Sequence, residues 1–339
     1  MPAIFLKASV RHGLVAITIG LMAWSVDGQV SALTGFAVGP GVIAMAAGIG
    51  FALFTGYNFV GVQPIISIVL PAAIICLGFG LDLSLFTESE VGIAGLGAIT
   101  ATLIATVTLT WLVGRALRLG TSVIVALGAG AAICGNTAVL AIAPLLQMKP
   151  DRLAVVLAAI NVLGLAMFVV VVIVTRTVGF SQDLAGIWAG ASIHAVPQAI
   201  AAGDAVGAGA GTTATAVKLS RVGLLVLLLP LVAGLQRERA AVQDREVSLF
   251  KSVRSYVPVY LPCFVLAVLA GNLSLVDASF ASDMHSIGRI LLIPVLAAVG
   301  MRITRESVRK TGGPVFLTGS LVTIGLATAS LAAAILLLG

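Results

Sequence analysis

Two segments of mostly aliphatic sequence carry polar side chains suited to binding an ion. The first is AGAAICGNTAVLAIA, residues 129–143, which places a thiol, an amide and a hydroxyl close together. A polar group buried in hydrocarbon costs free energy unless it has a hydrogen-bond partner. Such residues at membrane depth therefore indicate either a binding site or a packing contact. The candidate binding residues of this segment are Cys134, Gly135, Asn136 and Thr137.

The second segment is AGASIHAVPQAIAAG, residues 189–203. Pro197 lacks an N–H and its ring opposes the carbonyl four residues earlier, so a helix must kink or break there. The break frees backbone groups that suit an ion, although a proline in a membrane helix also serves packing alone. An ionisable residue at this depth indicates function, and an imidazole titrates near neutral pH. The candidate binding residues are Ser192, His194 and Gln198, with His194 as the coupling candidate.

Two cations follow in GTTATAVKLSRVGLLVLLLPLV, residues 211–232. Lys218 and Arg221 are three residues apart and therefore share one helix face. The simpler alternative is that both side chains extend to the membrane surface, but the apolar run continues beyond them. A lysine and an arginine converging on a cavity would pair with an anion or an acidic partner. Arginine is especially suited to oxyanions.

The acidic residues are distributed differently. All 13 Asp and Glu fall in loops or at the ends of apolar segments, and Asp82 and Asp204 come closest to the membrane. A desolvated cation needs a counter-charge, so cation carriers use buried carboxylates. The positive balance within the membrane therefore predicts an anionic substrate. The sequence has no HExxH motif and no paired aspartates, so neither an enzyme nor a metal or cofactor site is expected.

Composition defines the class of protein that positions these residues. Of 339 residues, 60% are hydrophobic and 9% are charged, whereas soluble domains contain about 25% charged residues. Long apolar stretches recur along the chain, which predicts an all-α polytopic membrane protein with a single transmembrane domain, residues 1–339. Residues 236–256 are expected to form a cytoplasmic loop between helix bundles. Eleven spans are expected, approximately at 13–27, 32–54, 61–81, 91–114, 121–147, 153–175, 184–204, 212–235, 257–275, 285–302 and 313–338.

The distribution of positive charge predicts the orientation. With the N-terminus in the cytoplasm, the inside segments hold 14 of the 19 Lys and Arg residues, and the outside loops hold only Lys149 and Arg152. The other three, Lys218, Arg221 and Arg289, fall within spans. Since cytoplasmic loops are enriched in Lys and Arg, the N-terminus is predicted in the cytoplasm and the C-terminus in the periplasm of a bacterial inner membrane.

Two internal similarities are present. Residues 69–114 and 289–339 each contain a Pro-containing span, a Gly-x-charged-x-hydroxyl turn and a Gly- and Thr-rich span. Because they begin at spans 3 and 10, they would run in opposite directions, as inverted repeats of transporters do. Residues 129–143 also align with 189–203 without gaps, but the span count makes these two segments parallel. An inverted repeat does not predict that, and the sequence leaves the discrepancy open.

The motifs GxAICGxxA, WAGASIHxxxQxxAAG and VKLxRV, in this order, resemble those of the YeiH-type membrane proteins, which often carry the label of sulfate exporters. The resemblance covers residues 32–339. It implies a core with crossed, interrupted helices that moves against a scaffold, commonly in a homodimer, as in bile-acid symporters and sodium/proton antiporters. The residues that match are Ile133, Cys134, Gly135, Ala138, Ser192, His194, Gln198, Lys218 and Arg221.

The chain departs from this pattern at four positions. Ala195 replaces an acidic residue that follows the histidine in many relatives, which puts ion coupling in doubt. Asn136 and Thr137 replace smaller residues, and Pro197 is unusual.

The expected function is a secondary active transporter, an exporter, of a small inorganic or sulfonate-type anion such as sulfate or sulfite. Its partners would be the lipid bilayer and a coupling ion, proton or sodium, with no role for nucleic acid. The alternatives are a cation/proton antiporter or a sodium-coupled organic-anion symporter on the same fold, or a channel.

Overall fold

In the computed structural model, every regular element is helical. It describes residues 2–34, 39–56, 59–84, 86, 89–241, 258–303 and 313–338, and no strand occurs among them. Six helical stretches of this part of the chain are long and apolar enough to cross a membrane. They are Ser9–Val30, Glu90–Ala116, Pro150–Val178, Ala208–Val232, Ala278–Gly300 and Pro314–Leu338. The predicted class, a helical membrane protein with several spans, is confirmed.

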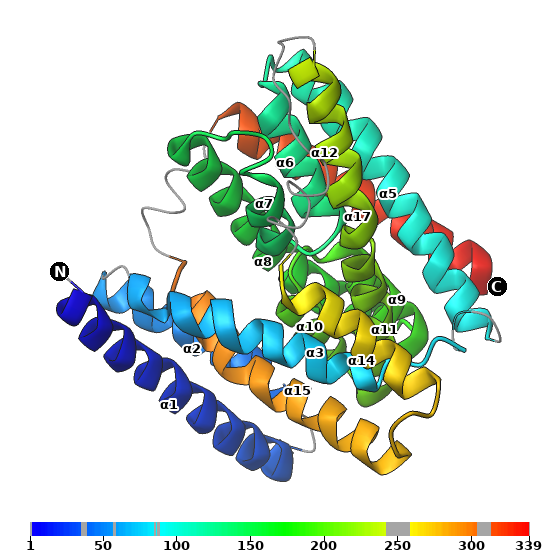
Figure 1. Cartoon of the computed structure of the whole chain (residues 1–339). Coiled ribbons are helices and arrows are strands. Elements are labelled where there is room, and N and C mark those ends of the chain that lie inside the picture. Colours follow the sequence, from blue (N-terminus) through cyan, green and yellow to red (C-terminus); the bar gives the residue numbers. More distant parts are fainter. Residues whose placement is uncertain are drawn as a thin grey trace.

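One set of helices, here called the scaffold group, lies together in blue, yellow and orange in Figure 1. It contains α1 (Pro2–Thr34), α2 (Pro40–Thr55), η1 (Val60–Val62), η2 (Ile65–Val69), α3 (Leu70–Phe79), α14 (Tyr260–Asn272) and α15 (Ala278–Gly300). The helix α1 is longer than the predicted span 13–27. Its neighbours are α2 and α15, and α3 packs on both α14 and α15.

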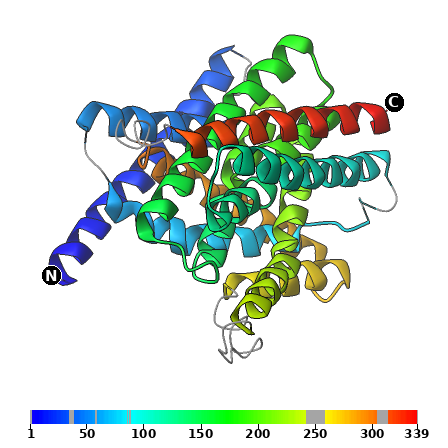
Figure 2. The ribbon, with the colours of Figure 1, turned by 90° about the horizontal axis from the view of Figure 1, so that it is seen from above.

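The remaining helices form the core group. It contains α5 (Glu90–Ala116), α6 (Thr121–Ala132), α7 (Asn136–Ile142), α8 (Pro150–Val178), α9 (Gln182–Ser192), α10 (Val196–Val206), α11 (Ala208–Gly223), α12 (Leu225–Ala241) and α17 (Pro314–Leu338). Figure 2 shows α5 and α17 side by side. The first residues of the predicted loop 236–256 are helical within α12, and 242–257 lie outside the described residues. The main packing between the two groups runs through α10, which contacts α2 and α15.

The helices α9 and α10 form a hairpin. A β-carbon on Gly186 of α9 would lie 2.6 Å from the carbonyl oxygen of Ala210, and one on Gly203 of α10 would lie 2.7 Å from the same oxygen. The side-chain oxygen of Gln182 accepts the N–H of Gly209 at 2.8 Å. In a straight span Gly186 and Gly203 would be about 25 Å apart. The chain therefore enters and leaves at one end of the core group, which corrects the predicted span 184–204.

The helices α6 and α7 form a second hairpin. A β-carbon on Gly130 of α6 would lie 2.8 Å from a methyl carbon of Val139 of α7, so the two arms pack against each other. The N–H of Gly135 donates to the carbonyl of Gly130 at 2.9 Å and closes the turn. A β-carbon on Gly120, just before α6, would lie 3.4 Å from the guanidinium of Arg152 at the start of α8. The predicted span 121–147 is therefore also a hairpin.

The two hairpins enter the core group from opposite ends of α8. The first opens beside the start of α8, at Arg152, and the second opens beside its end, where Arg176 donates to the carbonyl of Ala205. Their tips, residues 133–135 and 193–195, meet between these ends. A β-carbon on Gly135 would lie 3.4 Å from the carbonyl oxygen of His194. With 29 residues, α8 is about 44 Å long, enough to cross a bilayer.

Local sequence explains both breaks. Gly135 has φ 71° and ψ −128°, a conformation open only to glycine, so α6 cannot continue into α7. Pro197 is the second residue of α10, where its missing N–H has no intrahelical partner to lose. The proline therefore begins a new helix and does not kink a continuous one.

The hairpins also explain why the span count made the similar segments 129–143 and 189–203 parallel, against what an inverted repeat predicts. Because they enter from opposite ends, residues 129–143 and 189–203 run antiparallel, as an inverted repeat requires. The segments 69–114 and 289–339 pack against each other as well, since α3 contacts α15 and α5 contacts α17. Common ancestry of these repeats stays a prediction.

Gln182→Cys and Gly209→Cys together test the second hairpin. A β-carbon on Gly209 would lie 3.6 Å from the β-carbon of Gln182, a separation typical of disulfides. In a straight helix the two positions would be about 40 Å apart. With the three native cysteines replaced by serine, we expect this pair to resist a polyethylene-glycol maleimide until it is reduced. The pair Gln182→Cys with Gly223→Cys is the control, and equal maleimide labelling of both pairs without reduction would contradict the hairpin.

Candidate functional site

Arg221 holds the first arms of both hairpins. Its Nε donates to the carbonyl of Ala132 at 2.9 Å and its Nη2 to Ala131 at 2.6 Å, both at the end of α6. Its Nη1 donates to Gly190 at 3.2 Å and to Ala191, at the end of α9. The last carbonyls of a helix have no intrahelical donor. One guanidinium therefore supplies donors to two helix ends.

Lys218 completes this arrangement. Its Nζ donates to the carbonyl of Ile193 at 2.5 Å, in the tip that follows α9. Lys218 and Arg221 are both 0% exposed. The predicted shared face is confirmed, but in this structure the cations bind backbone carbonyls, and neither lines either of the two cavities described below. Their direct contact with an anion stays a prediction.

The charges at the tips do not balance. Each helix end carries about half a unit charge, so the ends of α6 and α9 offset about one of the two positive charges of the side chains. No carboxylate among the described residues is hydrogen-bonded to Lys218 or Arg221. The starts of α7 and α10, which carry partial positive charge, lie at the same tips. The place where the hairpins meet is therefore electropositive.

A cavity of about 590 Å³, here called the α7 cavity, borders the tips. Among the predicted residues, Cys134, Asn136 and Thr137 line it, and so does the start of α10 at Ala195–Pro197. The scaffold group forms the opposite wall. The polar lining residues that the sequence reading missed are Gln63, Ser67, Asn161 and Tyr260.

Two polar atoms at this cavity have no hydrogen-bond partner among the described residues. The amide of Asn136 donates to Asn161 Oδ1 at 2.6 Å, which leaves Asn136 Oδ1 without a hydrogen bond. The hydroxyl of Tyr260 also has no partner and is buried. A buried polar group is normally paired, so both are candidates to bind a ligand or water. Asn161 interrupts the apolar run of α8, a signal that was visible in the sequence.

The other predicted residues lie behind the cavity wall. His194 Nε2 lies 3.0 Å from Thr323 Oγ1, whose hydroxyl donates to Gly319, so we assign the imidazole proton to Nε2. Ser192 donates to the carbonyl of Trp188 at 2.5 Å. Gln198 donates to the sulfur of Met45 at 3.9 Å, across the boundary between the two groups. Gly135 forms the turn at the first tip. Within the described residues, no cluster of three metal-ligating side chains occurs.

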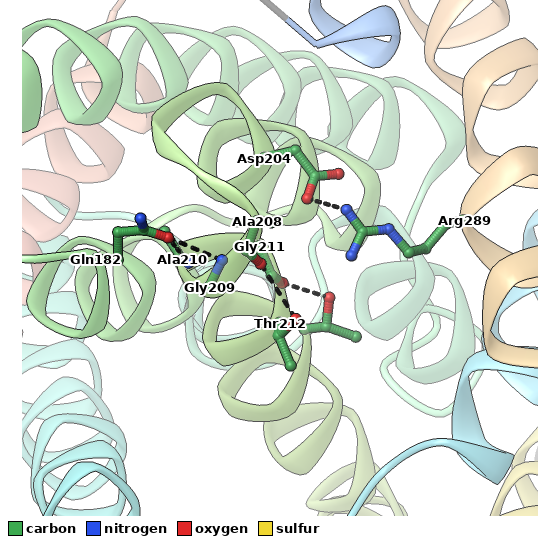
Figure 3. Close-up of polar contacts among 9 residues, drawn as sticks. Gln182, Asp204, Ala208, Gly209, Ala210, Gly211, Thr212 and Arg289 are labelled. Carbon is green, nitrogen blue, oxygen red and sulfur yellow. Dashed lines mark hydrogen bonds and ion pairs between the residues drawn. The ribbon is translucent and has the colours of Figure 1, made fainter. Parts of the chain in front are cut away.

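A second cavity, of about 640 Å³, follows the other side of α10 and is here called the α10 cavity. It is lined by charged residues from four helices: Asp27, Arg176, Asp204 and Arg289. Asp204 and Arg289 form an ion pair, which Figure 3 shows beside the turn from α10 to α11. Pro197 lines both cavities. The start of α10, directly after the tip of the second hairpin, therefore separates the two cavities at Pro197.

Arg221→Met tests the role of the guanidinium. The carbonyls of Ala131, Ala132 and Gly190 lose their guanidinium donors, whereas that of Ala191 keeps the hydroxyl of Thr102, and each unpaired buried group costs about 1–3 kcal/mol. We expect the melting temperature in detergent to fall by at least about 5 °C. Arg221→Lys keeps the positive charge but supplies fewer donors, so its melting temperature should lie between those of the parent protein and Arg221→Met. The exposed Arg152→Met is the control, and an unchanged melting temperature for Arg221→Met would refute the role.

Comparison with known proteins adds the following. The family model for conserved hypothetical protein 698 matches residues 6–319. The chain is 30% identical over 325 residues to a UPF0324 membrane protein of Yersinia pestis, covering 92% of this chain and 86% of that protein. It is 31% identical over 254 residues to one of Agrobacterium fabrum, covering 74% of this chain and 70% of the relative. A relative in Streptococcus pyogenes is 25% identical, with 94% of each chain covered.

Proposed function

We propose that this chain, which belongs to the conserved hypothetical protein 698 family of UPF0324 membrane proteins, is a secondary transporter of a small anion. The substrates would be inorganic or sulfonate-type anions, with sulfate and sulfite first. The observation that carries the proposal is the meeting of two opposed hairpin tips between two cavities. Interrupted helices that end near the middle of the membrane commonly form the binding sites of such carriers.

The two cavities support transport over enzyme or channel function. A carrier must expose one site to each side of the membrane in turn, so its access routes must be separated by a thin wall. Pro197, at the start of α10, lines both cavities and would form such a wall. The main contacts between the core group and the scaffold group involve α10, so a shift of α10 against α2 and α15 would open one cavity and close the other.

The charges support an anion as the substrate. Two buried cations and two helix starts converge at the tips, and none of the described residues that line the α7 cavity is acidic. An anion at the tips would contact the starts of α7 and α10, the thiol of Cys134 and the hydroxyl of Thr137. A cation at the same place would face positive charge, so the cation/proton antiporter alternative is disfavoured.

The hairpins strengthen the proposed orientation. A hairpin returns to the side from which it enters, so Lys149 and Arg152 belong to the cytoplasmic side and Arg176 to the outside. The cytoplasmic side then has fifteen Lys and Arg residues and the outside has one, whereas eleven full spans would give fourteen and two. By this rule the α7 cavity opens to the cytoplasm and the α10 cavity to the outside of a bacterial inner membrane.

Uptake of labelled sulfate and sulfite into proteoliposomes tests the proposal. We expect saturable flux with counterflow. Thr137→Val removes one hydrogen bond from the α7 cavity, worth about 1 kcal/mol, and should raise KM about fivefold. Thr100→Val, on an exposed face of α5, should leave KM unchanged.

His194→Ala in the same assay tests the predicted coupling residue. If His194 carries the coupling proton, anion flux through this variant should no longer depend on a pH gradient. Flux that never saturates would indicate a channel. Absence of sulfate and sulfite flux would refute both as substrates.

A further inference from the structure

The α10 cavity contains an ion pair between the core group and the scaffold group. Asp204 lies near the end of α10, and Arg289 lies midway along α15. Arg289 Nη2 donates to Asp204 Oδ1, and the two side chains are 31% and 25% exposed. Figure 3 shows Arg289 reaching towards the carboxylate from α15. The pair therefore closes the gap between the second hairpin and the scaffold group, on the wall of a water-accessible cavity.

The carboxylate is held by the core group. A β-carbon on Gly211 would lie 1.8 Å from Asp204 Oδ1, so the carboxylate rests directly on the backbone of α11. The end of α10 is fixed to α8, since Arg176 donates to the carbonyl of Ala205. Gln182 joins the start of α9 to the N–H of Gly209. The ion pair thus joins the end of α10, which is bonded to the rest of the core group, to α15 of the scaffold group. In the proposed transport cycle, α10 slides against α15 and α2.

The charges that face Asp204 are few. Arg289 approaches from α15, Arg176 from α8 and Asp27 from α1, whose carboxylate accepts the N–H of Gly39 at 2.8 Å. His285 lies one turn before Arg289 on α15 and packs against Gly80. The cavity therefore holds two arginines and two aspartates, and protonation of one carboxylate leaves it with one net positive charge.

We propose that Asp204 is a proton-binding site that controls the outer gate. While the carboxylate is charged, its ion pair with Arg289 holds α10 against α15. When Asp204 takes a proton from water in the α10 cavity, the ion pair is lost and Arg289 keeps its charge. The cavity then gains one net positive charge, which attracts an anion, so proton and anion enter together. This inference rests on the proposed function for its role as the coupling step.

A cysteine reporter at Ile200 tests the gate without reference to any substrate. Ile200 lines the α10 cavity and is 2% exposed. In a background with the three native cysteines replaced, labelling of Ile200→Cys by a membrane-impermeant maleimide is measured from outside. The labelling rate is divided by the rate for the same reporter combined with Asp204→Asn. The asparagine cannot bind the proton, and the titration of the reporter thiol, which is common to both variants, cancels in the ratio.

We expect this ratio to rise at least about tenfold as the pH falls from about 7 to about 4, because that range reaches the pH at which an aspartate carboxyl ordinarily takes up a proton. The reporter with Arg289→Gln, which breaks the ion pair from the other side, should label as fast at high pH as the one with Asp204→Asn. His285→Gln should keep the pH dependence of the parent. A ratio that is constant with pH, or an Asp204→Asn variant as slow as the parent at high pH, would overturn the gate.

The two proposals fail in different ways. Saturable anion flux together with pH-independent labelling would overturn the gate and support the transport function. Labelling that depends on pH through Asp204, in a protein that moves none of the anions offered, would support the gate and count against the transport of those anions.

Discussion

The fold depends on how the carbonyl groups at two helix ends obtain hydrogen-bond donors in the interior of the membrane. Hydrocarbon offers no donor, so a helix that stops at membrane depth needs one from the protein. Arg221 supplies donors to the ends of both α6 and α9, and Lys218 supplies one to Ile193. These side chains lie on a third helix, α11, which lets one element hold both hairpins. Their loss would leave unpaired carbonyl groups at both chain reversals.

This solution also shapes the site. Because the cations bind the ends of the first arms, the starts of the second arms, α7 and α10, remain directed at the α7 cavity. Their partial positive charge and the excess charge of Lys218 and Arg221 create an electropositive centre, although none of the described residues in the cavity wall is charged. Since α10 also carries the main contacts with the scaffold group, the element that borders the ligand is the one that must move.

Much of this was predictable from sequence, and the remainder was hidden for physical reasons. Pro197 located the break in the second segment, and the spacing of Lys218 and Arg221 placed them on one face. Hydropathy cannot distinguish a hairpin from a span, because both are apolar segments of similar length. The parallel alignment of 129–143 with 189–203 was the warning sign. The carbonyl partners of Arg221 come from segments about 30 and 90 residues away, which no local pattern reveals.

The central claim is that Pro197, at the start of α10, separates two access routes, so a single cysteine at position 197 is the most direct test. The Pro197→Cys variant, with the native cysteines replaced, would be treated with an impermeant thiol reagent in right-side-out and in inside-out vesicles. The account predicts labelling from both sides, slowed in both cases by a transported anion. Labelling from one side only would contradict it, because Pro197 would then border a single cavity.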